Sequence, residues 1–340
     1  MAAETTPDPP LYADLEEWAD VTPVPQYEGV QPLAPIFYTP EYKDATDYLR
    51  GVLATGELSP RVLALTERVI RLNPAHYTAW QLRYKTLIAI DASLPDELVL
   101  TNELSIKHLK TYQVWHHRRL LLTKLNDPTN ELPFVAKVLE TDHKNYHTWS
   151  HRQWVLAHFD RPELWEGELP FIEKMLEEDV RNNSAWHHRF FTVFERSGAD
   201  TGDDVVRREL SFTKEKIALA PNNPSAWNYI RGILDHTSTP YVTLNDFVLP
   251  YIAAAAPVSF SPAGDETPVV DLENPLPSKG SSLPAVPALD FIADVYEAEG
   301  EVQKAVTVWR SLADEHDTIR KKYWEYRIRE ATAASVSAAA

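Results

Sequence analysis

The sequence contains no cysteine at any of its 340 positions. Disulfide bonds, a cysteine nucleophile and a cysteine-ligated zinc site are therefore excluded within this chain. Long apolar runs are missing too, and no stretch approaches the roughly 20 residues needed to span a bilayer. The acidic, proline-rich start has no apolar signal region, and the alanine- and serine-rich end has no lipidation box. We expect a cytoplasmic protein with no membrane span.

Positive charge is scarce, with 33 Lys and Arg against 50 Asp and Glu, and the formal net charge is −17. A field of that sign repels phosphate backbones, which argues against nucleic-acid binding. The acidic surface either keeps the chain soluble or attracts basic partners, and composition alone does not decide between the two. Aromatic residues make up 11% of the chain, and ten are Trp. So many large rings need a sizeable core or interface.

Tryptophans reveal an internal repeat. Five of them are separated by 35, 34, 37 and 41 residues: Trp80, Trp115, Trp149, Trp186 and Trp227. The first four are each followed by Arg three positions later, at Arg83, Arg118, Arg152 and Arg189, and Arg231 follows the fifth one place further on. A sixth copy stands at Trp324 and Arg327. A period near 34 residues is typical of two helices joined by short turns.

Each repeat has the pattern of a helical hairpin. Apolar residues at spacings of three and four precede the first Trp, at Val62, Leu65, Val69 and Leu72. We predict that the second helices are capped by Asn73, Asn145, Asn182 and Asn223. Trp and Arg at i and i+3 share a face, so Trp should fill the space between layers. Arg should stack on rings or pair with acids of the neighbouring repeat.

No alternating β-branched run suggests a sheet. Since a single hairpin buries only one face, several must stack. The prediction is an all-α fold, an α–α superhelix in which antiparallel hairpin repeats form a crescent, a right-handed solenoid.

Composition sets the expected boundaries. Residues 1–40 are proline-rich and should be extended, and residues 41–330 should form the helical repeat domain. Within that domain, residues 250–287 contain eight prolines and read as an irregular insertion. Residues 331–340 read as a disordered tail.

Two clusters of polar residues are candidate sites. His143, His147 and His151 lie four apart, but a helix starting at Asn145 leaves His143 outside it, so no metal site is predicted. Lys110, Tyr112 and Gln113 stand at a turn into a helix, where a cation, a hydroxyl and an amide can converge on an anion. From the residues alone, a solvated lysine and a surface amide at a turn are the favoured reading, because a single Lys near a helix start is common.

Four longer segments carry a family resemblance. They are Trp18 to Pro25 (WADVTPVP), Tyr112 to Arg119 (YQVWHHRR), Asn145 to Trp154 (NYHTWSHRQW) and Asp317 to Trp324 (DTIRKKYW). Together with the fivefold repeat, they resemble the alpha subunits of protein farnesyltransferase and type I geranylgeranyltransferase. Departures are Thr111 where the family often has Asn, Pro224 where Tyr is common, and a longer insertion at 250–287.

The resemblance implies a heterodimer. A beta subunit would bind the catalytic zinc and most of the farnesyl or geranylgeranyl diphosphate, with magnesium assisting the diphosphate. The acceptor would be a protein ending in a Cys-aliphatic-aliphatic-X (CaaX) box.

The resemblance also implies roles for matching residues. Lys110 would reach the diphosphate, with Tyr146 and His147 close to the diphosphate and peptide. Gln113 would bind the terminal carboxylate of the acceptor, Tyr112 would lie at the peptide exit, and Tyr77 would edge the same cleft.

Two alternatives stay open. A Rab geranylgeranyltransferase alpha subunit shares the repeat but often carries an immunoglobulin-like insertion and a leucine-rich tail, which this sequence does not show. A tetratricopeptide-like scaffold would not be an enzyme, and that repeat has no Trp-x-x-Arg pattern.

Overall fold

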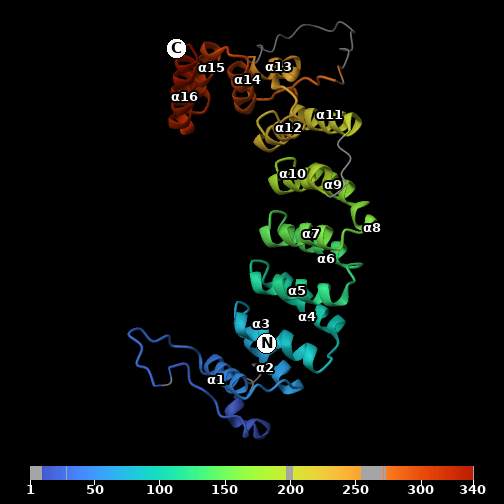
Figure 1. Cartoon of the computed structure of the whole chain (residues 1–340), viewed down its shortest axis with the longest axis vertical. Coiled ribbons are helices and arrows are strands. Elements are labelled where there is room, and N and C mark those ends of the chain that lie inside the picture. The colour runs from blue at the N-terminus through green and yellow to red at the C-terminus, as the bar shows by residue number, and fades with distance from the viewer. Residues whose placement is uncertain (1–9, 28, 197–201, 254–270, 272, 340) are drawn as a thin grey trace, which may run out of the picture. The chain divides into compact units, whose positions relative to one another are not determined.

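The computed structural model describes residues 10–27, 29–196, 202–253, 271 and 273–339. The chain divides into two compact units, residues 1–160 and 161–340. Across the described ranges every regular element is helical and no residue is in a strand (Figure 1), which confirms the all-α prediction. Within the same ranges, no helix is both long and apolar enough to cross a membrane.

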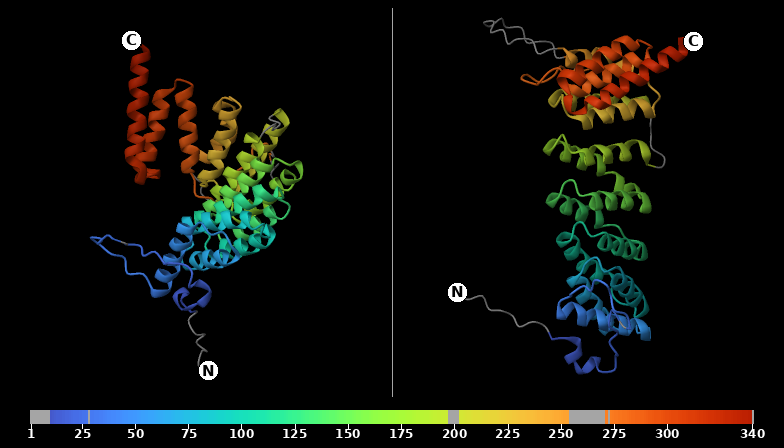
Figure 2. Two further views of the ribbon diagram at one scale, coloured as in Figure 1. Left: turned by 60° about the horizontal axis from the view of Figure 1, so that its bottom comes forward. Right: turned by 90° about the vertical axis from the view of Figure 1, so that its left-hand side faces the viewer.

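The first unit is a short N-terminal segment followed by helical hairpins. Its elements are the 3-10 turns η1 (Tyr12–Asp14) and η2 (Glu16–Trp18), then α1 (Pro40–Thr55), α2 (Pro60–Leu72), α3 (Tyr77–Ala89), α4 (Leu94–Lys107), α5 (Tyr112–Leu125), α6 (Glu131–Thr141) and α7 (Tyr146–Phe159). Helices α2 and α3, α4 and α5, and α6 and α7 pack as pairs. The second helices α3, α5 and α7 contact one another in chain order, so the hairpins stack (Figures 1 and 2).

The second unit continues the hairpin pattern. It contains α8 (Pro162–Trp165), α9 (Glu168–Glu178), α10 (Asn183–Phe190), the π-helical turn η3 (Phe191–Glu195), α11 (Asp203–Leu219), α12 (Pro224–His236), η4 (Tyr241–Leu244), α13 (Asn245–Ile252), α14 (Val286–Ala298), α15 (Val302–Ser311), the π-helical turn η5 (Leu312–His316), η6 (Thr318–Arg320) and α16 (Lys321–Ala339). Here α9 and α10, and α11 and α12, form the repeat pairs.

The repeated tryptophans are structural, as expected. All five are buried. Each indole Nε1–H donates to the backbone carbonyl six residues earlier, for example from Trp80 to Pro74 at 2.8 Å and from Trp115 to Leu109 at 3.1 Å. The indole therefore fills the hairpin core and also closes the turn that precedes its helix.

The repeated arginines pair with acids of the following repeat, which confirms that prediction. Arg83 bonds Glu97 on α4, and Arg189 bonds Glu209 on α11. Ring stacking is present too: the Arg189 guanidinium lies 3.7 Å from the centroid of Phe212.

The capping prediction is confirmed for three asparagines and is wrong for Asn73. Asn145, Asn182 and Asn223 each accept a backbone N–H at the start of their helix. Asn73 instead ends α2, and the Nδ1 of His76 caps α3. The turn explains the difference, because the bond from His76 N to Asn73 O matches the bond from Asn145 N to Asp142 O.

The N-terminal segment is not simply extended as expected. Residues 12–18 form two 3-10 turns because Trp18 is buried against Tyr12 and Tyr48, with ring centroids 4.9 and 5.8 Å away. The backbone N–H of Tyr12 also donates to Asp44 at 2.6 Å, which ties the segment to α1.

The expected insertion differs at its start. Pro250 lies inside α13 rather than in irregular chain. Residues 254–270 and 272 lie outside the described residues. Further on, Ser278 donates from N and Oγ to the carbonyl of Ala218 at 2.9 and 2.7 Å. Tyr251 also donates to the carbonyl of Pro275 at 2.6 Å, so 273–285 is held against the helices.

The expected disordered tail was wrong over residues 331–339, because α16 continues to Ala339. The physical reason is composition, since alanine has the highest helix propensity of all residues. Ala331 is also buried in the core of the second unit, which holds the start of this stretch against its neighbours.

Candidate functional site

The site begins with three exposed tyrosines in equivalent positions. Tyr77, Tyr112 and Tyr146 are the first residues of α3, α5 and α7. Because each helix starts shortly after the same kind of turn, each ring projects from the same end of its hairpin. All three rings are largely exposed. The repeat therefore presents a series of tyrosines along one edge of the first unit.

The start of α5 differs from its neighbours. At α3 and α7 the preceding side chain accepts a backbone N–H, whereas Thr111 makes no such bond at α5. A helix start without a side-chain cap leaves N–H groups directed at solvent or at a ligand. Lys110 lies exposed in the turn 108–110 that leads into this helix.

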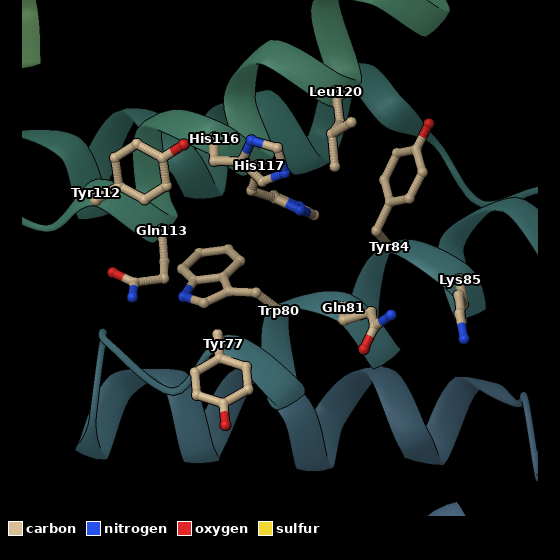
Figure 3. A pocket seen from close by; sticks show the side chains of 10 residues that line it. All are labelled: Tyr77, Trp80, Gln81, Tyr84, Lys85, Tyr112, Gln113, His116, His117 and Leu120. Atoms are coloured by element: carbon tan, nitrogen blue, oxygen red, sulfur yellow. The ribbon is translucent and has the colours of Figure 1, made fainter.

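A pocket of about 610 Å³ lies between α3 and α5 (Figure 3). It is lined by Tyr77, Trp80, Gln81, Tyr84, Lys85, Tyr112, Gln113, His116, His117 and Leu120. Toward one end lie Tyr77, Tyr112 and Gln113, and toward the other lie Tyr84 and Lys85 (Figure 3). Its size and mostly aromatic lining, with a few amides, are those of a ligand pocket.

Two fixed rings form the floor of this pocket. The Trp80 indole is held by its bond to Pro74, and the His117 ring lies 4.8 Å from it, centroid to centroid. The Nε2–H of His117 donates to Glu97 Oε1 at 2.8 Å. Neither ring can turn without breaking a buried hydrogen bond, so the pocket floor is preformed.

Buried charges beneath the floor are balanced. Burial by itself would raise the pKa of Glu97. Hydrogen bonds from His117 and Arg83 outweigh burial, so the net result is a pKa below the usual range of a glutamate. Burial lowers the pKa of His117, and its buried Nδ1 makes no hydrogen bond within the described residues. An imidazolium would leave that second N–H without an acceptor, so His117 is neutral. The cluster is one cation, one anion and one neutral ring.

The same triad recurs along the chain. Arg118, Glu131 and His151 repeat it in the first unit, with Arg118 Nε and His151 Nε2 both 2.6 Å from Glu131 Oε1. At Glu209 in the second unit Tyr229 takes the place of histidine, and its hydroxyl donates to Glu209 at 2.7 Å. The triad is therefore part of the repeat, and only at Glu97 does it support the pocket of about 610 Å³.

An aromatic cluster forms around Tyr112. Its ring stacks on His116 with centroids 6.1 Å apart and planes 9° apart. The same ring meets His147 edge-on at 6.4 Å, and Tyr146 lies 5.5 Å from His147. Tyr112 therefore connects the pocket between α3 and α5 to the start of α7.

The structure brings most of the candidate residues together. Tyr77, Tyr112 and Gln113 share the pocket, and His147 and Tyr146 join it through Tyr112. Lys110 is two residues from Tyr112 in the turn but is not among the residues that line the pocket. The roles assigned to all six residues stay predictions.

Sequence reasoning missed His116 and Glu97. Adjacent residues on a helix point apart, so His117 is buried and His116 is exposed at the pocket. A signal for the glutamate existed: Glu97, Glu131 and Glu168 each stand 20 residues before a bonded histidine.

Comparison with known proteins agrees with this architecture. The model of the family described as "Protein prenyltransferase alpha subunit repeat" matches residues 59–89, 94–125, 128–159, 165–196 and 206–237. The Protein farnesyltransferase/geranylgeranyltransferase type-1 subunit alpha of Schizosaccharomyces pombe is 35% identical over 92% of this chain and 94% of its own length. The chain belongs to the protein prenyltransferase alpha subunit family. The matched repeats are the Trp-centred hairpins α2/α3, α4/α5, α6/α7, α9/α10 and α11/α12.

Two further members of the family place the chain within it. The solved structure titled Candida albicans protein geranylgeranyltransferase-I complexed with GGPP matches at a TM-score of 0.78 and 30% identity, over 92% of this chain and 97% of that chain. The Geranylgeranyl transferase type-2 subunit alpha of Homo sapiens is 30% identical over 57% of this chain and only 37% of its own length. The type-1 likeness therefore extends along nearly the whole chain, and the type-2 likeness does not.

Proposed function

We propose that this chain is the alpha subunit of a heterodimeric CaaX prenyltransferase of the cytoplasm, active only with a beta subunit. The enzyme transfers a farnesyl group, or with another beta subunit a geranylgeranyl group, from the isoprenoid diphosphate to the acceptor cysteine. The observation that carries the proposal is the uncapped start of α5, where Tyr112 and Gln113 line an aromatic pocket and Lys110 lies in the turn two residues before Tyr112. Full-length similarity to type-1 alpha subunits supports it.

In the proposed reaction the acceptor sulfur forms a bond to C1 of the isoprenoid, and the C1–O bond breaks. The products are a thioether and free diphosphate, so negative charge grows on the leaving group. A fixed cation and helix N–H groups aimed at that group stabilise the transition state more than the ground state. Lys110 and the first turn of α5 supply both kinds of donor, which supports a catalytic role for Lys110.

Gln113 supports recognition of the acceptor. Its amide is half-buried at the Tyr112 end of the pocket. An amide N–H donates to a carboxylate without adding a charge of its own. In the proposal Gln113 binds the C-terminal carboxylate of the acceptor, Tyr77 edges the same cleft, and Tyr112 lies at the peptide exit.

The second edge of the proposed site is the start of α7. The ring of His147 meets that of Tyr112, and Tyr146 packs against His147, so these three side chains form one aromatic cluster. Tyrosine hydroxyl and imidazole N–H groups are suitable donors to diphosphate oxygens. We assign them to the diphosphate and the neighbouring peptide.

Zinc belongs to the second subunit in this proposal, where it holds the acceptor thiolate when bound. Within the described residues no three His, Asp or Glu side chains gather as metal ligands, and the sequence offers no cysteine. We therefore assign no zinc-dependent step to the residues of this chain. Magnesium assisting the diphosphate stays part of the proposal.

The two alternatives find less support. A Rab-type alpha subunit is represented among the relatives by the type-2 protein, which matches little more than a third of its own length. A tetratricopeptide-like scaffold does not explain the prenyltransferase repeat in five consecutive hairpins.

The test is co-expression of the full chain with candidate beta subunits. The complex is assayed with labelled farnesyl and geranylgeranyl diphosphate and a CaaX peptide. Transfer that requires the beta subunit is the expected result, and the label accepted identifies the donor. A complex that modifies only Rab proteins would favour the type-2 alternative, and failure to form any complex would contradict the proposal.

A further inference from the structure

Arg119 on α5 lies in the hollow between α5 and α7. Residues four positions after a repeated Trp line the hollows between neighbouring second helices: Tyr84 does so between α3 and α5, and Phe190 between α10 and α12. Arg119 stands four positions after Trp115, in the same place of its repeat. Its Nη2 donates to the backbone carbonyl and to the hydroxyl of Ser150 on α7, at 3.0 and 3.2 Å. The side chain therefore bridges the two helices.

No carboxylate of the described residues pairs with Arg119. Its hydrogen bonds go only to Ser150, and its buried Nε–H has no acceptor among the described residues. The guanidinium lies 5.3 Å from the ring centroid of Trp154. Burial lowers the pKa of Arg119, against a smaller opposing effect of the phenols of Tyr112 and Tyr146. The hollow thus holds a half-buried cation without a counterion.

Other arginines of the repeats are balanced by acids. The preceding residue, Arg118, pairs with Glu131. Arg231 has the place of Arg119 in its own repeat, and it pairs with Asp294. Acids are plentiful in a chain with a formal net charge of −17. Since desolvating an unpaired charge is costly, the lack of an acid at Arg119 points to an anion from outside the chain.

This charge lies on the inner side of the aromatic cluster formed by Tyr112, His147 and Tyr146. Arg119 stands seven residues after Tyr112 on α5, which is two helical turns on the same face, or about 10 Å along the axis. Ser150, its partner on α7, stands one turn after Tyr146. Arg119 therefore fixes the spacing of α5 and α7 just below the cluster, and its field reaches an anion bound there.

We propose that Arg119 is a positioning residue for the diphosphate: it holds α7 against α5, and its unbalanced charge attracts the anion to the aromatic cluster. The inference rests on the proposed function, which supplies the diphosphate. Arg119 does not line the pocket between α3 and α5, and it acts at a distance rather than by contact. At about 10 Å, a partly screened unit charge changes the affinity for an anion about 3- to 10-fold.

The test is the Kd of inorganic diphosphate for the assembled heterodimer, measured by calorimetric titration with the full chain. Arg119→Gln should weaken binding about 3- to 10-fold at low salt. The difference from the unaltered chain should shrink at about 1 M salt, where the screening length is about 3 Å. Arg119→Lys keeps the charge and should stay within about twofold. Equal weakening by the Gln and Lys variants would overturn the role of the charge.

A second pair of variants separates charge from packing. Ser150→Asp offers Arg119 a carboxylate in place of a hydroxyl. It should weaken diphosphate binding as Arg119→Gln does, and it should not lower the thermal unfolding temperature. Ser150→Asn is the uncharged matched control and should leave the Kd within about twofold. If Arg119 only held the helices together, Ser150→Asp would strengthen that contact and leave the Kd unchanged, which would overturn the inference.

Prenyl transfer by the same heterodimers separates this inference from the proposed function. An active heterodimer whose diphosphate Kd ignores the charge of Arg119 overturns the inference and leaves the function standing. Charge-dependent diphosphate binding in a heterodimer that modifies no CaaX peptide keeps the role of Arg119 and overturns the proposed reaction. A heterodimer that binds no diphosphate overturns both.

Discussion

Arg83 and Glu97 form a buried two-point ion pair across the boundary between two repeats. Arg83 donates from Nε and a terminal nitrogen to the two carboxylate oxygens, each at 2.6 Å. His117 donates to the same carboxylate from the other side. One glutamate thus joins the hairpin before it to the second helix of its own hairpin. Buried charges of this kind are tolerated only when every donor and lone pair finds a partner.

Glu97→Gln should destabilise the full chain strongly. The substitution keeps the shape of the side chain but leaves the buried Arg83 guanidinium with only the more exposed carboxylate of Glu67, 3.6 Å away. Removing one partner of a buried pair costs about 3–5 kcal/mol. The free energy of unfolding from urea titration measures this. The matched control is Glu103→Gln, which breaks the exposed pair with Arg71 and should cost at most about 1 kcal/mol. Equal effects of the two changes would contradict the structural role given to Glu97.

The Arg118–Glu131–His151 triad predicts that acid lowers the free energy of unfolding over two pH ranges, an upper and a lower window. Burial lowers the pKa of His151 below its usual value of 6.5, so below about pH 6.5 the unfolded chain binds more protons. Burial would raise the pKa of Glu131, but the charge of Arg118 and hydrogen bonds from His151 and Arg118 lower the pKa to about 2. Its contribution to stability is therefore complete above about pH 4.5 and is lost as the pH falls toward 2.

Urea unfolding between pH 3 and pH 8 measures this dependence. We expect stability to fall on acidification, first below pH 6.5 and more steeply below pH 4.5. Glu131→Gln should flatten the lower window because the carboxyl no longer titrates. A lower window of unchanged slope in this variant would show that other carboxyl groups cause it.

Lys110→Ala should slow prenyl transfer in the heterodimer much more than it weakens assembly. Removing one charge-stabilising contact to a leaving group typically costs ~10²–10³ in rate. Single-turnover transfer and the Kd of the subunits are the two measurements. Lys107→Ala, at the exposed end of α4 one turn earlier, is the matched control and should leave the rate within about twofold. An unchanged turnover rate for Lys110→Ala would remove the catalytic role assigned to it.

Gln113→Ala should mainly weaken binding of the acceptor peptide. Loss of the amide donor removes a hydrogen bond to a charged carboxylate. Such a bond contributes roughly 1.5–3 kcal/mol, which is about 10- to 100-fold in Kd. Peptide titration by fluorescence and the single-turnover rate at saturating peptide separate binding from chemistry. A slower rate at saturation with unchanged peptide affinity would place Gln113 in the chemistry instead.

The sequence predicted the parts of the fold that depend on periodic, local patterns. The spacing of Trp80, Trp115 and Trp149 predicted the hairpin repeat, and the position of Asn145 predicted the start of a helix. Capping at Asn73 was predicted wrongly because Asn73 stands seven residues before Trp80, in the place that Asp142 has before Trp149, and His76 takes the capping position of Asn145. Alignment of the turns, rather than residue type, settles which residue caps.

The candidate site was predicted in part, because its residues come from repeat motifs. Tyr77, Tyr112 and Gln113 were identified by resemblance, and the structure adds that they share one pocket. The buried triads were not predicted, since an acid 20 residues before a histidine has no meaning until the hairpin brings the two together. The helix that continues to Ala339 was missed because low sequence complexity was taken for disorder.

The glutamate shared between neighbouring hairpins also defines the segment of chain that can be deleted, duplicated or exchanged as one unit. A whole repeat, from one shared glutamate to the arginine before the next, can be excised or duplicated with every buried charge still matched. Removing the stretch from Glu97 to Arg118, with the turn after it, would present Glu131 to Arg83 in the geometry that Arg118 now uses. A crossover inside a hairpin would instead leave one guanidinium or one carboxylate without a counterpart. Chimeras with other members of the family therefore have natural joints in the turns before Glu97 and Glu131.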